Sequence, residues 1–366
     1  LVSSEEFPNP RSKKPNTKMT VQKASLYKSK GELPVLGERP IPSPSEGQVQ
    51  VKVISAGVNP VDWKRIECDL VVNPTWPQIL GSDVAGDVTV LGSKVAGLKV
   101  GERVHGDSLF QASLEDRDQS AFQQYAVQNH DLMSRIPNHI SYDRAATIPL
   151  ASFTALIGLF HHTGLGLHPP HDLEARSRPH PPSTTSILII GGASNVGQFA
   201  IQYAKMVGFE KIITTASAKN HELLTKLGAT HVFDRHTRDL AEQIKEISGE
   251  DLRYAFDTIS SDETYATALG ALADRHPVYL AGVLPVPEDR SRFPRKPDGS
   301  EWKAVFAAPQ HLRELSVPFY KVIGTWLETN QIRTPEIMVV PGGLGAVSEA
   351  LMRLKEGRVS AKKLII

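Results

Sequence analysis

A continuous apolar run, Ser186–Ile190, leads directly into a glycine-rich segment at 191–197, and this junction constrains the fold more than any other feature of the chain. An apolar run without polar alternation predicts a strand buried on both faces, as in a parallel sheet. Glycines let the backbone approach a pyrophosphate, and the positive end of a following helix, expected over 198–207, attracts it. The standard dinucleotide fingerprint has a middle glycine where Ser194 stands. Taken alone, the segment fits a structural strand-to-helix turn equally well.

The sequence after this junction alternates between strand and helix patterns. Strands are expected at 186–190, 211–216, 231–234, 254–259 and 278–281, with helices at 198–207, 221–227, 240–248 and 264–273. Such repetition predicts a doubly wound parallel sheet, which favours the dinucleotide interpretation of the glycine-rich turn. Ligands bind at the carboxyl edge of such sheets. The expected cofactor-binding residues are therefore those of the turn and those after the last strand: Gly192, Ala193, Ser194, Asn195, Val196, Gly282 and Val283.

The sequence before the junction has a different pattern. Short strands closed by glycine and proline turns, at 48–54, 83–91, 103–104 and 122–127, predict an antiparallel, barrel-like domain. An apolar helix follows at 144–160, broken near Pro149, and then a Pro/His-rich loop at 164–186.

The C-terminal segment after a second expected loop, at 285–303, is too short to fold alone. It is predicted to form a helix at 313–330, a strand at 336–340, a helix at 344–357 and a strand at 363–366. We therefore expect a disordered tail at 1–18, a discontinuous first domain at 19–147 and 310–366, and a second domain at 148–309.

Charge and cysteine content exclude several classes of protein. Forty-one basic residues balance forty acidic ones, for a net charge of +1 over 366 residues, which argues against a nucleic-acid partner. No apolar run approaches the roughly 18 to 20 residues of a membrane span, so no membrane partner is expected. The single cysteine, Cys68, excludes an intramolecular disulfide and a four-cysteine zinc site, and it favours a reducing, cytoplasmic location.

Several stretches together resemble the medium-chain dehydrogenase/reductase superfamily, over roughly residues 20–366. The similar stretches are the run 77–104, with Gly81, Asp83, Gly86, Gly92 and Gly101 on pattern, and the segments 121–127, 149–155, 226–229 and 357–366. The resemblance implies an α/β chain in which a GroES-like antiparallel β-barrel catalytic domain accompanies a Rossmann doubly wound parallel sheet.

The sequence differs from the zinc enzymes of that superfamily at the expected metal ligands, and these differences point to one branch of it. Asn59 and Ser82 stand near the positions of a cysteine and a histidine ligand, so no metal is expected. The motif at 58–62 is typical of the zinc-free quinone oxidoreductase and enoyl reductase branch. The continuation at 62–64 and the Pro-rich insertion look most like fungal enoyl reductases that act in trans with polyketide synthases. The resemblance implies an NADPH-dependent reductase of an enone, an enoyl thioester or a quinone, as a monomer or a homodimer, with a polyketide synthase as a partner.

Without a metal, the negative charge that develops on an enolate oxygen needs a hydrogen-bond donor. Lys64 and Asn59 follow the first long strand and could donate, and Thr154 lies where the resemblance implies contact with the nicotinamide or its ribose. The alternatives are a solvated lysine, an asparagine that forms a turn before Pro60, and an ordinary threonine at a helix start. Asp62 is interpreted as a residue that orients this loop through its backbone.

The end of the second parallel strand bears on the choice of cofactor. Enzymes specific for NAD place an acidic residue there, whereas this chain continues with Ser217 and Lys219 and has no carboxylate. A hydroxyl and an ammonium attract a 2′-phosphate, and Arg235 after the third strand is expected nearby. The sequence therefore predicts NADPH. A non-catalytic, crystallin-like NADPH-binding protein is the alternative function.

Overall fold

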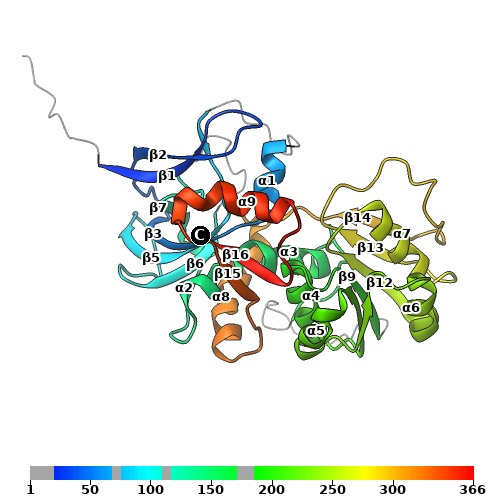
Figure 1. Cartoon of the computed structure of the whole chain (residues 1–366). Coiled ribbons are helices and arrows are strands. Elements are labelled where there is room, and N and C mark those ends of the chain that lie inside the picture. The colour runs from blue at the N-terminus through cyan, green and yellow to red at the C-terminus, as the bar shows by residue number, and fades with distance from the viewer. Residues whose placement is uncertain (1–19, 68–75, 109–116, 171–184) are drawn as a thin grey trace, which may run out of the picture.

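The computed structural model describes residues 20–67, 76–108, 117–170 and 185–366. The tail at 1–18, Cys68 and the central part of the Pro/His-rich insertion lie outside the described residues. The expected combination of a barrel-like half and a doubly wound half is confirmed (Figure 1). The exact domain boundaries stay a prediction.

The first half contains two sheets. A small antiparallel sheet has the order β2-β1-β4, and a seven-stranded sheet has the order β15-β16-β3-β5-β6-β8, with β7 paired to β3. The strands from the N-terminal part of the chain are β1 (Val21–Tyr27), β2 (Val35–Pro40), β3 (Gln48–Gly57), β4 (Gln78–Ile79), β5 (Asp83–Leu91), β6 (Arg103–Asp107), β7 (Tyr125–Asn129) and β8 (Met133–Arg135). Val49 and Val51 of β3 and Val84 and Val88 of β5 lie in the core of this half.

The C-terminal strands join this same sheet. β15 (Glu336–Val339) runs parallel to β16 (Lys362–Ile365), and β16 pairs antiparallel with the end of β3, where Ile365 lies opposite Gly57. Helix α9 (Val347–Lys355) packs beside α1 (Pro60–Glu67), so the last residues of the chain lie next to the segment that follows β3 (Figure 1). This pairing brings Lys362 and Lys363 to the region of Asn59.

The second half is a six-stranded parallel sheet with the order β11-β10-β9-β12-β13-β14. Its strands are β9 (Ser186–Ile190), β10 (Lys211–Ala216), β11 (His231–Asp234), β12 (Leu252–Asp257), β13 (Tyr279–Gly282) and β14 (Glu301–Ala304). All five residues of β9 are buried, because helices cover both faces of the sheet. The order reverses between β9 and β12, and such a reversal opens a crevice at the carboxyl ends of the strands.

The remaining helices cover the parallel sheet or join the two halves. They are α2 (Tyr142–Ala145), α3 (Pro149–Phe160), α4 (Asn195–Met206), α5 (His221–Leu227), α6 (Leu240–Ser248), α7 (Asp262–Ala271) and α8 (Arg313–Glu328). Phe153 of α3 packs against Phe319 of α8, and Tyr203 of α4 packs against Trp326 of α8. Because α8 also contacts β8, one apolar cluster continues from the parallel sheet to the barrel-like half.

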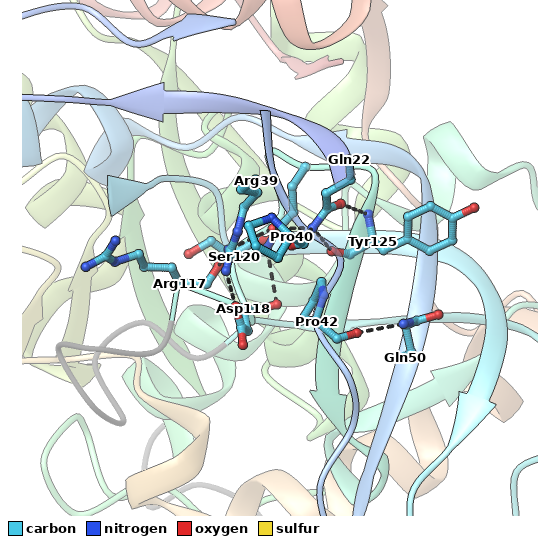
Figure 2. A network of polar contacts seen from close by, with 10 residues as sticks. Gln22, Arg39, Pro40, Pro42, Gln50, Arg117, Asp118, Ser120 and Tyr125 are labelled. Atoms are coloured by element: carbon cyan, nitrogen blue, oxygen red, sulfur yellow. Dashed lines mark hydrogen bonds and ion pairs between the residues drawn. The ribbon is translucent and has the colours of Figure 1, made fainter. Parts of the chain in front are cut away.

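A buried polar network fixes the small sheet against the start of β7 (Figure 2). The Gln22 side chain donates to the carbonyl of Tyr125 at 3.1 Å and accepts from its N–H at 2.6 Å. Arg39 pairs with Asp118 and donates to Gln123 at 3.0 Å. The Gln123 amide nitrogen in turn donates to three backbone carbonyls of segment 117–120. These side-chain bonds add to the backbone hydrogen bonds that tie 121–124 to β1 and to residues 80–81.

Four sequence expectations need correction. α4 begins at Asn195, three residues before the expected start, because Ser194 caps it. The strand expected at 122–127 is β7 at Tyr125–Asn129, because Gln123 makes only an isolated bridge, to Ala24 of β1. The loop expected at 285–303 ends in β14, which pairs with β13 and adds a sixth strand. The expected loop after β3 is helix α1, whose first residue, Pro60, has a fixed φ suited to that position.

Candidate functional site

A cleft of about 1100 Å³ lies between the carboxyl edge of the parallel sheet and the barrel-like half. Residues at the ends of β9, β10 and β12 line one side, and residues of α1, α3 and the C-terminal segment line the other. Ten of the sequence-predicted site residues line it: Asn59, Lys64, Thr154, Ala193, Ser194, Asn195, Val196, Ser217, Arg235 and Val283. The two halves of the fold thus bring both sets of candidates to one cavity.

The glycine-rich turn has the geometry of a phosphate cradle. The Ser194 hydroxyl accepts the N–H of Gly197 at 2.9 Å and contacts the Thr258 hydroxyl at 2.8 Å. The N–H groups of the first helical turn have no partner inside a helix, and those of Asn195 and Val196 have no backbone acceptor among the described residues. Both residues line the cleft.

The glycines of the turn are required by close packing. A Cβ on Gly197 would lie 2.5 Å from the Gly191 carbonyl oxygen and 2.7 Å from the Gly192 Cα. A Cβ on Gly192 would lie 2.1 Å from the Thr214 hydroxyl oxygen. Gly192 does not line the cleft, and neither does Gly282, whose Cβ would meet the Tyr265 hydroxyl. These two predicted contact residues lie behind the cleft wall.

The end of β10 has polar groups and no carboxylate of its own. Ser217, Asn220, Arg235 and His236 line the cleft there. Asp234, at the end of the adjacent β11, accepts the N–H groups of His236 at 2.8 Å and Ala218 at 3.0 Å, which lowers its pKa. The Asp234 carboxylate is therefore hydrogen-bonded to the loops that follow β10 and β11. Lys219 is exposed and is not among the lining residues, so its predicted contact depends on the reach of a flexible side chain.

Lys64 and Thr154 line the cleft from two different helices. Lys64 is half-buried on α1, with its ammonium 5.7 Å from the centre of the Trp63 ring. Trp63 lines the same cleft and packs on the barrel core, as a pocket wall would. On α3, the Thr154 hydroxyl donates to the Leu150 carbonyl at 2.7 Å, and its oxygen can still accept.

Asn59 belongs to a buried polar cluster immediately behind the cleft. Its amide nitrogen donates to Asp83 at 2.8 Å, and its amide oxygen accepts from Lys363 at 2.5 Å. Asp62 accepts the backbone N–H groups of Asn59 at 2.8 Å and Gly81 at 3.1 Å, so it orients this segment as expected. Burial raises the pKa of Asp62 to about 6.

Two further buried groups lie deeper in the same half. On β6, burial lowers the pKa of His105 to about 3 and raises that of Asp107 well above its usual value, with the Asp83 carboxylate as a further cause for Asp107. Asp107 lies opposite Asp83 in the pairing of β6 with β5. Both ring nitrogens of His105 lack a hydrogen-bond partner within the described residues.

Sequence reasoning missed the C-terminal contribution to the cleft. Ser360, Ala361 and Lys362 line it, and Ser360 accepts from the Asn220 amide at 3.2 Å across the two halves. The Gln198 amide donates to the Ala361 carbonyl at 3.4 Å. The similarity of residues 357–366 to the terminal strand of the superfamily was the signal that could have placed them.

No metal centre is present among the described residues: no three His, Cys, Asp or Glu side chains are placed to hold an ion. Within the same residues, every helix is too short or too polar to cross a membrane.

Two protein-family models match the chain. The alcohol dehydrogenase GroES-like domain matches residues 45–138, and a second model, described as zinc-binding dehydrogenase, matches residues 195–307. The dehydrogenase azaJ of Aspergillus niger is 34% identical over 353 residues, with 94% of this chain and 98% of the relative covered. The trans-enoyl reductase ACTTS2 of Alternaria alternata is 32% identical, with 95% and 99% covered. The chain therefore belongs to the medium-chain dehydrogenase/reductase superfamily, in its enoyl reductase branch.

Solved structures share the fold. The quinone oxidoreductase of Coxiella burnetii has a TM-score of 0.72 at 23% identity, covering 94% of this chain and 99% of that one. A mycobacterial protein complexed with NADPH has a TM-score of 0.67 at 19% identity, with 94% and 99% covered. These structures show the fold, whereas the family and its trans-enoyl reductase relatives make the protein an oxidoreductase with a nicotinamide cofactor and a small-molecule substrate.

Proposed function

We propose that the protein is a zinc-independent, NADPH-dependent reductase of carbon–carbon double bonds conjugated to a carbonyl group, in enones or enoyl thioesters, or of quinones. The observation that carries this proposal is one cleft lined both by the phosphate cradle of α4 and by Lys64, Asn59 and Thr154. The resemblance to trans-acting enoyl reductases supports enoyl thioesters, presented by a polyketide synthase.

Different residues of the cleft would bind the cofactor, stabilise the enolate oxygen and deliver the proton. Bound NADPH would supply the hydride. Backbone N–H groups of Asn195 and Val196 would hold the diphosphate, and Ser217 and Arg235, which line the cleft, would bind the 2′-phosphate. The enolate oxygen that forms needs a positioned donor, which Lys64 or Asn59 supplies. The Lys64 ammonium, on Nζ, is also placed to deliver the proton.

The proposed activity is tested by NADPH oxidation, followed by absorbance, against a panel of 2-enals, enones, enoyl thioesters and quinones. We expect steady turnover on at least one class. Binding of NADPH without turnover on the whole panel would favour the crystallin-like alternative instead.

Lys64→Ala is expected to lower kcat by about 10²-fold, the usual effect of removing one donor to a developing oxyanion. The affinity for NADPH should change little, because Lys64 lies on α1, on the barrel-like side of the cleft. Steady-state kinetics and a fluorescence titration with NADPH measure the two effects. An unchanged kcat would leave Lys64 as a surface lysine and return the role to Asn59 or Thr154.

Cofactor preference is tested at the end of β10. Lys219→Ala and Arg235→Ala each remove a cation from the expected 2′-phosphate site, and a charge-assisted contact contributes about 1.5–3 kcal/mol. We therefore expect about tenfold or greater weakening for NADPH and almost none for NADH. Given the exposed position of Lys219, Arg235 is expected to have the larger effect. Equal losses for both cofactors would exclude a role in reading the phosphate.

Zinc independence is tested by chelation. Metal analysis of the purified protein should show no stoichiometric zinc, and prolonged exposure to a chelator should leave turnover intact, because Asn59 is engaged by Asp83 and Lys363. Activity that is lost with the chelator and restored by added zinc would contradict this prediction.

A further inference from the structure

A closed ring of three polar contacts lies behind the cleft wall. The Lys363 ammonium is 2.5 Å from the Asn59 amide oxygen and 2.6 Å from Asp83 Oδ2. The Asn59 amide nitrogen donates to the same Asp83 oxygen at 2.8 Å. The three side chains come from β16, from the segment between β3 and α1, and from β5. Asn59 is 3% exposed, Lys363 1% and Asp83 0%.

The charges of this ring determine which way the Asn59 amide points. With the opposite orientation, the NH₂ group would face the Lys363 ammonium, and the amide oxygen would face the Asp83 carboxylate. Both contacts would be repulsive in a buried site, where such interactions are poorly screened. The ring is tightly packed, because a Cβ on Gly57 would lie 2.8 Å from both Asp83 Oδ2 and Lys363 Cε.

With this fixed orientation, one hydrogen-bond donor of Asn59 has no partner among the described residues. The amide nitrogen of Asn59 carries two hydrogens, and Asp83 accepts one of them. The described residues offer no acceptor for the other, and Asn59 lines the cleft. A donor that is buried and left unmatched by the protein needs a ligand oxygen or water.

Asp83 also holds a second element on the same side of the cleft, helix α3. Its other oxygen, Oδ1, accepts the backbone N–H of Leu150 at 2.7 Å. Leu150 lies in the first turn of α3, and its carbonyl accepts from the Thr154 hydroxyl. One carboxylate therefore holds Asn59 on one side and the helix that carries Thr154 on the other.

We propose that Lys363 is a positioning residue that fixes the Asn59 amide so that its second N–H hydrogen-bonds the carbonyl oxygen of the substrate. This inference rests on the proposed reduction of a conjugated carbonyl compound. It assigns Lys363 a role that needs no contact with substrate or cofactor. The final strand of the chain, distant in sequence from Asn59, thereby becomes part of the machinery that stabilises the enolate oxygen.

The decisive variant is the double substitution Asp83→Asn/Lys363→Met. Lys363→Met alone would leave the Asp83 charge buried without its ion-pair partner, which is destabilising, whereas the double variant removes both charges. The amide introduced at position 83 can donate as well as accept, so the preferred orientation of the Asn59 amide is lost. We expect a cooperative thermal transition, a kcat lowered by about 10²-fold and a KM for NADPH within about twofold of the parent. Lys321→Met, on the exposed face of α8, is the matched control.

A second measurement does not depend on turnover. In protein labelled with ¹⁵N-asparagine, the two Nδ2 protons of Asn59 should differ in their protection from hydrogen exchange. The proton bonded to the Asp83 carboxylate should be protected, and the proton that faces the cleft should be less protected. The double variant should lose this difference. Two equally protected protons in the parent protein would overturn the inference, and this result is available even if the double variant does not fold.

The outcomes separate this inference from the proposed function. If the parent protein reduces a member of the panel and the folded double variant keeps its kcat, the role of Lys363 is overturned and the function stands. If the parent protein reduces none of them, the function fails. The Asn59 proton pattern then decides alone whether Lys363 and Asp83 fix the amide.

Discussion

Gly197→Val is expected to weaken the binding of NADPH by about 10²- to 10⁴-fold. Any Cβ at this position meets the backbone of Gly191 and Gly192 at 2.5–2.7 Å, so the turn must open. Opening it displaces the N–H groups of Asn195 and Val196, and two charge-assisted hydrogen bonds contribute about 3–6 kcal/mol together. A fluorescence titration with NADPH measures the loss.

The matched control for this substitution is Gly345→Ala. A Cβ on Gly345 meets no atom within 4 Å, and its φ lies outside the left-handed region. The control should bind NADPH like the parent protein. A Gly197→Val protein that is folded by circular dichroism and binds NADPH normally would show that the turn does not hold the diphosphate.

Acidification is expected to destabilise the protein through His105. The pKa of this histidine is about 3 in the folded protein and 6.5 in the unfolded chain, because burial disfavours the imidazolium. The unfolded chain therefore binds more protons between these values, and stability is lost as the pH falls from 6.5 towards 3. The contribution reaches about 2 kcal/mol at pH 5 and about 4 kcal/mol at pH 3.

His105→Leu should remove this contribution. Asp62 acts in the opposite direction, since its raised pKa makes the folded protein more stable as the pH falls from about 6 to 3.8. Asp62 is present in both proteins, so its effect cancels in the difference between parent and variant in the free energy of unfolding. From urea unfolding, it should change by about 1.4 kcal/mol per pH unit below about pH 6. His276→Leu, at an exposed histidine, should follow the parent, and a constant difference for His105→Leu would contradict the prediction.

Repeated patterns made the parallel sheet predictable. The bounds of β9, β10, β11, α5 and α6 agree with the expectation, because each strand or helix has an unbroken apolar period and a turn at its end. The start of α4 was missed, since Ser194 reads as a substitution in a glycine motif, whereas its hydroxyl forms the cap. β14 was missed because its short polar sequence forms a strand only beside β13.

The candidate site, like the fold, was predictable from the sequence only in part. Local sequence placed the glycine-rich turn, Lys64, Asn59 and Thr154, because strand-to-helix turns and family motifs are contiguous in the chain. It did not place Ser360, Lys362 or Lys363, which reach the site only when β16 pairs with β3. It also could not show that both ends of the Asn59 amide are engaged by charged side chains.

The amino-acid sequence by itself determined the two-part fold, the glycine-rich turn and most strands and helices of the parallel half. The tertiary structure alone decided that Asp83 and Lys363 are buried together against Asn59, and that His105 is enclosed without a partner among the described residues. The physical reason is the separation along the chain of the residues that interact. Periodicity and turn chemistry act between residues a few positions apart, whereas the pairing of buried charges depends on which distant strands become neighbours.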